Sequence, residues 1–109
     1  MNLVGLFTIL KETNLPVTYS HFNETSTNPV PDPPFITYIE DPSSNMFADN
    51  KVHKQVKNVR IELYTNKKDL EAEAKIEALL DENELPYETD ETFIESEQLF
   101  QKIYEVGLI

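Results

Sequence analysis

The sequence predicts an α+β fold: an antiparallel β-sheet of about five strands with two helices packed on one face. Three observations lead to this prediction. Two segments carry apolar residues at helical spacing, five shorter segments are rich in β-branched and aromatic residues, and prolines or polar runs separate them. The expected order is α-β-β-β-α-β-β. Because 109 residues is the size of one ordinary domain, residues 1–109 are expected to fold as a single unit.

The N-terminal part predicts a helix and two strands. Leucines and a phenylalanine recur at helical spacing over residues 3–13, and Pro16 stops the pattern. Residues 17–22 are rich in β-forming side chains and predict a strand. Residues 23–34 include four prolines, which remove backbone donors, so we expect a long hairpin loop there. A second strand is then expected at residues 35–40.

A second long loop is expected over residues 41–54, and it contains the apolar pair Met46 and Phe47 in a polar context. Such a pair either folds back into the core or is exposed for a partner. The first interpretation is favoured, because large exposed apolar patches are uncommon on monomers. The clearest strand follows at residues 55–65. Its apolar and polar residues alternate, which predicts a sheet with one covered face.

The C-terminal part predicts a helix and a hairpin. A Glu-rich and Ala-rich run with apolar residues at helical spacing indicates a helix over residues 70–83. Residues 87–94 are extended, residues 95–98 turn, and residues 99–106 form the last strand. A Leu-Pro dipeptide follows each predicted helix and leads into a strand. This suggests a weak internal duplication of helix, Leu-Pro and hairpin.

The charge is strongly acidic and unevenly distributed. A net charge of −11 argues against nucleic acid or an anionic membrane as a direct partner. Residues 51–68 hold six basic residues and one acid, whereas residues 69–109 hold thirteen acids and two lysines. Opposite charges allow a chain to bind its own copies head to tail, although a solvated surface of uneven charge is the simpler interpretation. The interface candidates are Lys51, Lys54, Lys57, Arg60, Lys67, Lys68, Glu71, Glu73, Glu77, Met46 and Phe47.

No pattern in the sequence indicates a catalytic, cofactor or metal site, so we do not expect an enzyme. The chain has no Cys, and its histidines, His21 and His53, lie in different segments without a ligand-spaced partner. Two glycines are too few for a phosphate-binding loop. An enzyme with an unusual carboxylate site is the weakest alternative. No apolar run is long enough to cross a membrane, and no export signal is evident, so no membrane partner is expected.

Several stretches resemble small proteins of tailed phages and prophages of Gram-positive bacteria. They are PFITY at 34–38, NMFADN at 45–50 and RIELYTNKKD at 60–69, together with LPVTY at 15–19. The resemblance extends over about residues 15–106 and is to head–tail joining or tail-terminator (tail completion) proteins. It implies a structural protein that forms a hexameric ring at the virion neck, with the tail tube and the head connector as partners. Assembly would take place in the cytoplasm of the bacterial host.

An acidic phage-encoded inhibitor or DNA mimic, which binds a host nucleic-acid enzyme, is the alternative from another functional class. The acidic segment 69–109 suits this function, because it can copy the charge of a phosphate backbone. The basic segment 51–68 argues against it, because it interrupts a uniformly negative surface.

Overall fold

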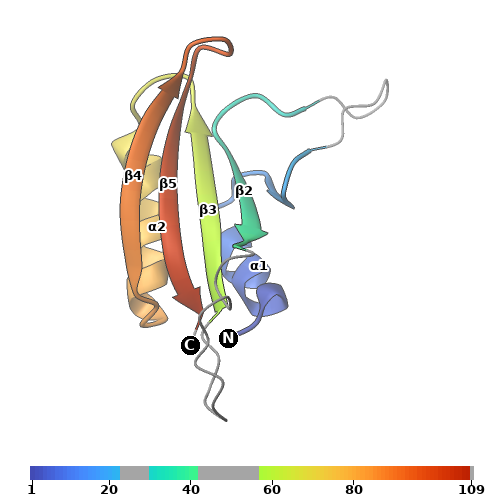
Figure 1. Ribbon diagram of the computed structural model, residues 1–109, viewed down its shortest axis with the longest axis vertical. Helices are drawn as coiled ribbons and strands as arrows, with labels where there is room; N and C mark the ends of the chain where they lie inside the picture. The colour runs from blue at the N-terminus through green and yellow to red at the C-terminus, as the bar shows by residue number, and fades with distance from the viewer. Residues whose placement is uncertain (23–29, 42–56, 109) are drawn as a thin grey trace.

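The computed structural model describes residues 1–22, 30–41 and 57–108, which form two layers (Figure 1). One layer is a five-stranded mixed sheet, and two helices cover one face of it. The α+β class and the order of elements are confirmed. The helices and strands are α1 (Leu3–Lys11), β1 (Val17–Tyr19), β2 (Phe35–Glu40), β3 (Lys57–Thr65), α2 (Leu70–Glu82), β4 (Tyr87–Ile94) and β5 (Leu99–Leu108).

Both helices begin at a side-chain cap. The Asn2 side chain accepts the Gly5 N–H at 2.8 Å, and the Asp69 carboxylate accepts the Ala72 N–H at 3.0 Å. Each cap satisfies one of the N–H groups that have no partner inside the first turn. The sequence therefore fixes where α1 and α2 begin.

The end of α2 explains the Leu-Pro signal. Glu84 adopts a left-handed conformation with φ of 55°. The Leu85 N–H then bonds the Leu80 carbonyl at 2.9 Å, and the Glu84 N–H bonds the Asp81 carbonyl at 3.0 Å. These two bonds form a Schellman motif, in which the residue after the turn contacts the helix it has left. Leu85 is accordingly buried, and the next residue, Pro86, directs the chain into β4.

The sheet has the order β1-β2-β3-β5-β4, and its pairs are antiparallel except for β1 and β2. Val17 lies opposite Ile36 in a parallel ladder, so the hairpin predicted across residues 23–34 is wrong. Parallel neighbours need a crossover connection of a dozen or more residues, which the proline-rich stretch is long enough to provide. The predicted duplication is lost with this hairpin, because the two strands after α1 are parallel and the two strands after α2 are antiparallel.

Several predicted boundaries move by a few residues. Helix α1 ends at Lys11 instead of residue 13, and β5 continues to Leu108. Strand β1 stops at Tyr19, because Ser20 has φ of 66° and the His21 N–H bonds the Tyr19 carbonyl at 2.7 Å. The hairpin and loop boundaries that fall in 23–29 and 42–56 lie outside the described residues.

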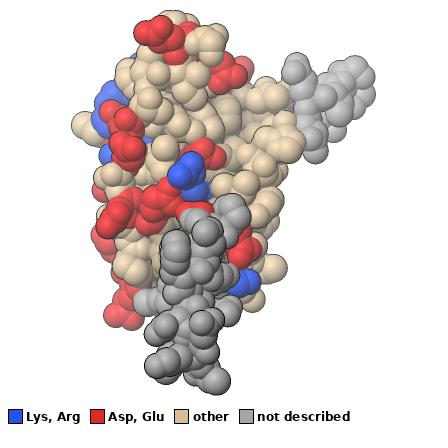
Figure 2. Space-filling model, viewed as in Figure 1, with Lys and Arg blue, Asp and Glu red and all other residues tan. Residues whose placement is uncertain are grey.

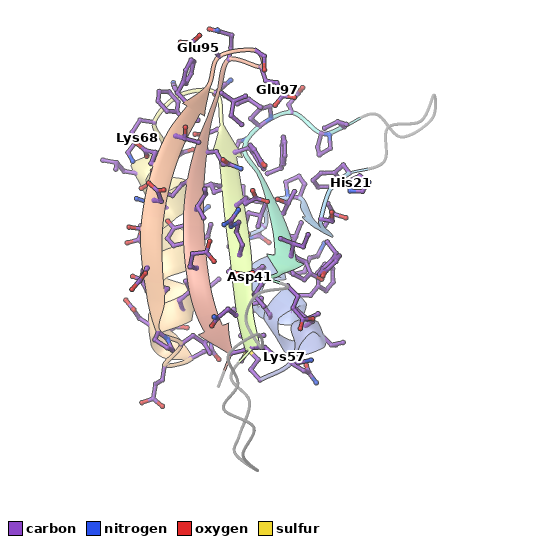
Figure 3. All side chains as sticks on the ribbon, in the orientation of Figure 1. His21, Asp41, Lys57, Lys68, Glu95 and Glu97 are labelled. Atoms are coloured by element: carbon purple, nitrogen blue, oxygen red, sulfur yellow. The ribbon has the colours of Figure 1, made fainter. Side chains whose placement is uncertain are left out.

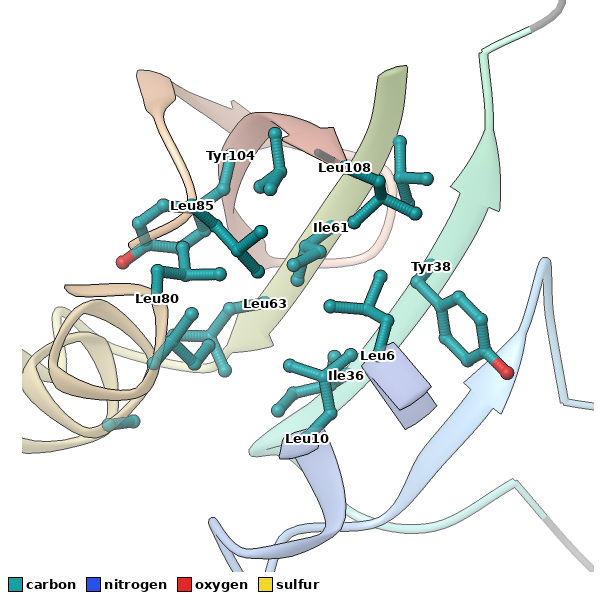
Figure 4. Close-up of a cluster of buried hydrophobic side chains, with 14 residues drawn as sticks. Leu6, Leu10, Ile36, Tyr38, Ile61, Leu63, Leu80, Leu85, Tyr104 and Leu108 are labelled. Atoms are coloured by element: carbon teal, nitrogen blue, oxygen red, sulfur yellow. The ribbon is translucent and has the colours of Figure 1, made fainter. Parts of the chain in front are cut away.

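The core lies between the helices and the covered face of the sheet (Figure 4). Leu6 and Leu10 of α1 meet Ile76 and Leu80 of α2 over the strands, and all four are fully buried. Burial of each such side chain contributes about 1.5–3 kcal/mol. The central strands supply alternate residues to the same cluster, which are Ile36, Tyr38, Val59, Ile61, Leu63, Tyr104, Val106 and Leu108.

The two ends of the chain lie at the same end of the long axis of the molecule (Figure 1). The strand register agrees with the position of the C-terminal end: Leu108, the last residue of β5, lies opposite Lys57, the first residue of β3.

Candidate functional site

The second face of the sheet is covered by no helix of the described chain, and we call it the open face (Figure 1). Alternation along β3 places Val59 and Ile61 under the helices and turns Arg60, Glu62 and Tyr64 to the open face. The prediction of a sheet with one covered face is confirmed. The open face is therefore a sheet surface that the described chain does not use for its core.

A hydrogen-bond network fixes the centre of the open face. The Thr37 hydroxyl of β2 donates to Glu62 Oε1 at 3.0 Å. Gln101 Nε2 of β5 donates to Glu62 Oε2 at 2.6 Å and to the Tyr64 hydroxyl at 2.9 Å. Burial, followed by the charge of Glu62, raises the pKa of Tyr64. The network joins three neighbouring strands and keeps the Tyr64 ring in place.

An aromatic hollow of about 420 Å³ lies beside this network. The Phe35 and Tyr64 rings stack with centroids 5.1 Å apart, and Phe22 meets Phe35 edge to face at 5.4 Å. Pro31 and Pro33 line the same hollow from the chain that precedes β2. The volume is that of a small binding pocket, and the lining is mainly apolar with a few polar groups. Such a hollow suits an apolar or aromatic side chain of a partner.

Charged and polar side chains stand around the hollow. His21 and Glu97, both labelled in Figure 3, are part of its lining. His21 Nδ1 lies 3.1 Å from the Ser20 hydroxyl, and no other side-chain hydrogen bond of this ring is found within the described chain. Sequence reasoning missed this site, because its lining comes from four stretches that are far apart in the chain.

The described basic candidates are mostly paired within the chain. Lys68 Nζ lies 2.8 Å from Glu73 Oε2 and also bonds Glu91, and these bonds raise the pKa of Lys68. Arg60 Nε lies 2.7 Å from Glu105 Oε1 on the open face. These two cations already have carboxylate partners, so they are less available to a second molecule.

The basic segment does not form one patch. Lys57 and Lys68 lie at opposite ends of the sheet in Figure 3. The reason is that β3 is extended, so its nine residues span about 30 Å. Lys67 is exposed, and no ion pair to it is found among the described residues. Lys51, Lys54, Met46 and Phe47 lie outside the described residues.

The three acidic candidates of α2 differ in their surroundings. Glu71 is exposed, whereas Glu73 is buried and lies near Lys68 and, at 3.8 Å, near Lys102. Glu77 Oε2 accepts the Tyr104 hydroxyl at 2.9 Å. Glu73 and Glu77 therefore serve the fold, and Glu71 is the one of the three that faces solvent.

Several exposed carboxylates lie along β4. Figure 2 shows acidic side chains over the β4 side of the open face and an uncharged surface towards β2. Glu88, Asp90 and Glu91 are exposed members of this acidic edge. No three His, Asp or Glu side chains are placed to hold a metal ion in the described ranges. No helix of the described chain is long and apolar enough to cross a membrane.

The fold and this surface define a two-layer α+β protein with an open sheet face, an aromatic hollow and an acidic edge. Comparisons with protein-family models, with curated proteins and with solved structures give no match.

Proposed function

We propose that this chain is a structural protein of the head–tail junction of a tailed phage, where its copies form a ring that terminates or joins the tail. The observation that carries the proposal is the open face. A sheet with one uncovered face, an ordered polar centre and an aromatic hollow is suited to hold another protein. On this proposal, copies of the chain bind one another to form the ring, and the ring contacts the tail tube and the head connector.

The segments that resemble phage neck proteins also build this surface. PFITY at 34–38 supplies Phe35 and Thr37 of β2, and RIELYTNKKD at 60–69 supplies Glu62 and Tyr64 of β3. The third segment, 45–50, lies outside the described residues. The resemblance therefore falls on residues that face outward as well as on core positions, which supports a shared binding role.

The proposal is tested by deleting the gene in its phage and imaging the particles by electron microscopy. The expected result is heads and tails that are not joined, or tails of abnormal length, with normal virions restored by the unaltered gene in trans. A Phe22→Ser variant removes one wall of the hollow and should restore virions poorly. Leu70→Ser is its control, because Leu70 is an apolar, exposed residue of α2 that does not line the hollow. Normal virions after deletion would overturn the proposal.

The acidic edge favours a second function, an inhibitor or DNA mimic that binds a host nucleic-acid enzyme. Glu88 and Asp90 are two residues apart on one strand, so their carboxylates lie on the same face. On this function the purified chain inhibits a host nuclease at low salt, and the inhibition is lost at high salt. Deletion of the gene would then leave virion assembly intact.

A further inference from the structure

We propose that the aromatic hollow binds an arginine side chain of a partner protein, and that the Glu97 carboxylate pairs with the guanidinium group of that arginine. The inference rests on the proposed function, because it names the side chain by which a neighbouring virion protein would be held at this site. It goes further by committing to a charged occupant, whereas aromatic walls alone would accept any apolar side chain.

The walls of the hollow are three aromatic rings at two orientations. The Phe35 and Tyr64 rings are inclined by 30° with centroids 5.1 Å apart. The Phe22 ring is inclined by 86° to that of Phe35, with centroids 5.4 Å apart. All three residues are half-buried, so each of them keeps accessible surface. A cation is attracted to the face of an aromatic ring, and a planar guanidinium can lie flat against one.

The charge at the hollow is negative and has no cationic partner in the described chain. Glu97 is an exposed residue of the lining, and Glu62 lies behind the lining residue Thr37. Neither carboxylate forms an ion pair with a described residue, and no described residue of the lining is a lysine or an arginine. Glu62 already accepts bonds from Thr37 and Gln101 on its two oxygens. Glu97 is therefore the carboxylate that can bond an incoming cation.

Arginine suits this combination of rings and carboxylate better than lysine does. Its aliphatic stem can pack against the aromatic walls while its charged head reaches a carboxylate at the rim. The guanidinium is planar and weakly hydrated, so it stacks on rings and bonds a carboxylate through two N–H groups at once. The lysine ammonium is a strongly hydrated point charge, and it gains less from the rings.

The arginine belongs to a protein other than this one. Arg60 is the only arginine of the chain, and its Nε lies 2.7 Å from Glu105 Oε1 on the open face of the same molecule. A second copy of the chain therefore offers lysines to the hollow but no unpaired arginine. Arginine and lysine ligands accordingly distinguish a different protein from a second copy as the occupant.

The first test titrates the full chain with N-acetyl-arginine amide and follows its amide NMR spectrum at about pH 8 and about 0.15 M salt. Shifts should concentrate at Phe22, Phe35 and Tyr64, with a Kd of the order of 1 mM for a probe of this size. N-acetyl-citrulline amide has nearly the same shape but no charge, and it should bind at least about tenfold more weakly. Equal binding of the two probes, tighter binding of N-acetyl-lysine amide, or no shifts at the hollow would overturn the inference.

The second test compares two carboxylates of the β4–β5 turn. Both Glu95 and Glu97 are exposed, but Glu97 lies on the His21 side of the turn and lines the hollow, whereas Glu95 lies on the other side (Figure 3). Glu97→Gln should weaken binding of the arginine probe about tenfold and leave that of the citrulline probe unchanged. Glu95→Gln removes the same charge from the chain and should bind both probes like the unaltered protein. Equal effects of the two variants would show that net charge alone attracts the probe, which contradicts the inference.

Phage genetics separate this inference from the proposed function. Supplied in trans to the deletion phage, Glu97→Gln should restore fewer joined virions than Glu95→Gln. If deletion leaves heads and tails unjoined but the two variants restore virions equally and the arginine probe does not bind, the inference is overturned and the neck function stands. If the arginine probe binds at the hollow but deletion gives normal virions, the arginine site stands and the neck function is overturned.

Discussion

Tyr104 shows how a single buried polar group is accommodated in this core. Its ring is fully buried among the helices, and its hydroxyl reaches Glu77 at the surface of α2 at 2.9 Å. Burial, followed by the hydrogen bond to Glu77, raises the pKa of Tyr104 well above its ordinary value. The neutral phenol is therefore the form that the folded protein requires.

Substitution Tyr104→Phe should lower the stability at neutral pH and weaken its dependence on pH above pH 10. A raised folded-state pKa contributes stability that is complete below the unfolded pKa of about 10 and is lost as pH rises toward the folded value. At pH 7.5 the variant should be less stable by about 1 kcal/mol through the lost bond to Glu77. Above pH 10 its free energy of unfolding should fall less steeply than that of the unaltered chain. Urea unfolding at several pH values measures both effects, and parallel curves would contradict the prediction.

Four turn residues adopt a positive backbone angle φ, which is uncommon for residues other than glycine. Asn14, Ser20, Glu84 and Gln98 have positive φ although none is glycine. An L-residue in this conformation is strained by about 1–2 kcal/mol. At Glu84 the strain is accepted because the Schellman motif places Leu85 in the core.

Glu84→Gly should stabilise the protein by about 0.5–1 kcal/mol. Glycine adopts the left-handed conformation without strain, although part of the gain is offset by a more flexible unfolded chain. Glu84→Ala removes the same side chain without relieving the strain, so it serves as the matched control. The urea midpoint of each variant measures the difference, and equal midpoints would show that Glu84 is not strained.

Most elements could be predicted from the sequence because each carries a local signal. The alternation along β3 and the helical spacing in α1 and α2 reflect which side chains meet the core. The parallel pairing of β1 with β2 has no such signal. Strand β1 has three residues, and its partner lies beyond a long connection, so the direction of pairing depends on tertiary contacts.

At the scale of the whole molecule, charge that is contiguous in the sequence is dispersed in space. The basic segment predicted one patch, but β3 separates Lys57 from Lys68. Lys57, Arg60, Lys68 and Lys102 each form an ion pair with a carboxylate of the same chain. The hollow could not be predicted either. Its aromatic rings come from Phe22, Phe35 and Tyr64, which only the folded sheet brings together.

Charge reversal at Lys67 and at Lys68 should therefore have different effects. Lys67→Glu alters an exposed side chain and should weaken self-association while leaving the melting temperature of the monomer nearly unchanged. Lys68→Glu places a third carboxylate beside Glu73 and Glu91, so it should lower the melting temperature of the monomer itself. Light scattering and thermal unfolding separate the two effects. Equal melting temperatures for the two variants would contradict the assignment of Lys68 to the fold.

The position of the two chain ends has a practical consequence for locating the molecule within a larger particle. Both ends lie at one pole of the long axis. A gold-binding or fluorescent tag fused at either end therefore marks the same pole, well away from the tip of the β4–β5 turn at the other. One tagged chain is enough to read the polarity of each copy in a micrograph.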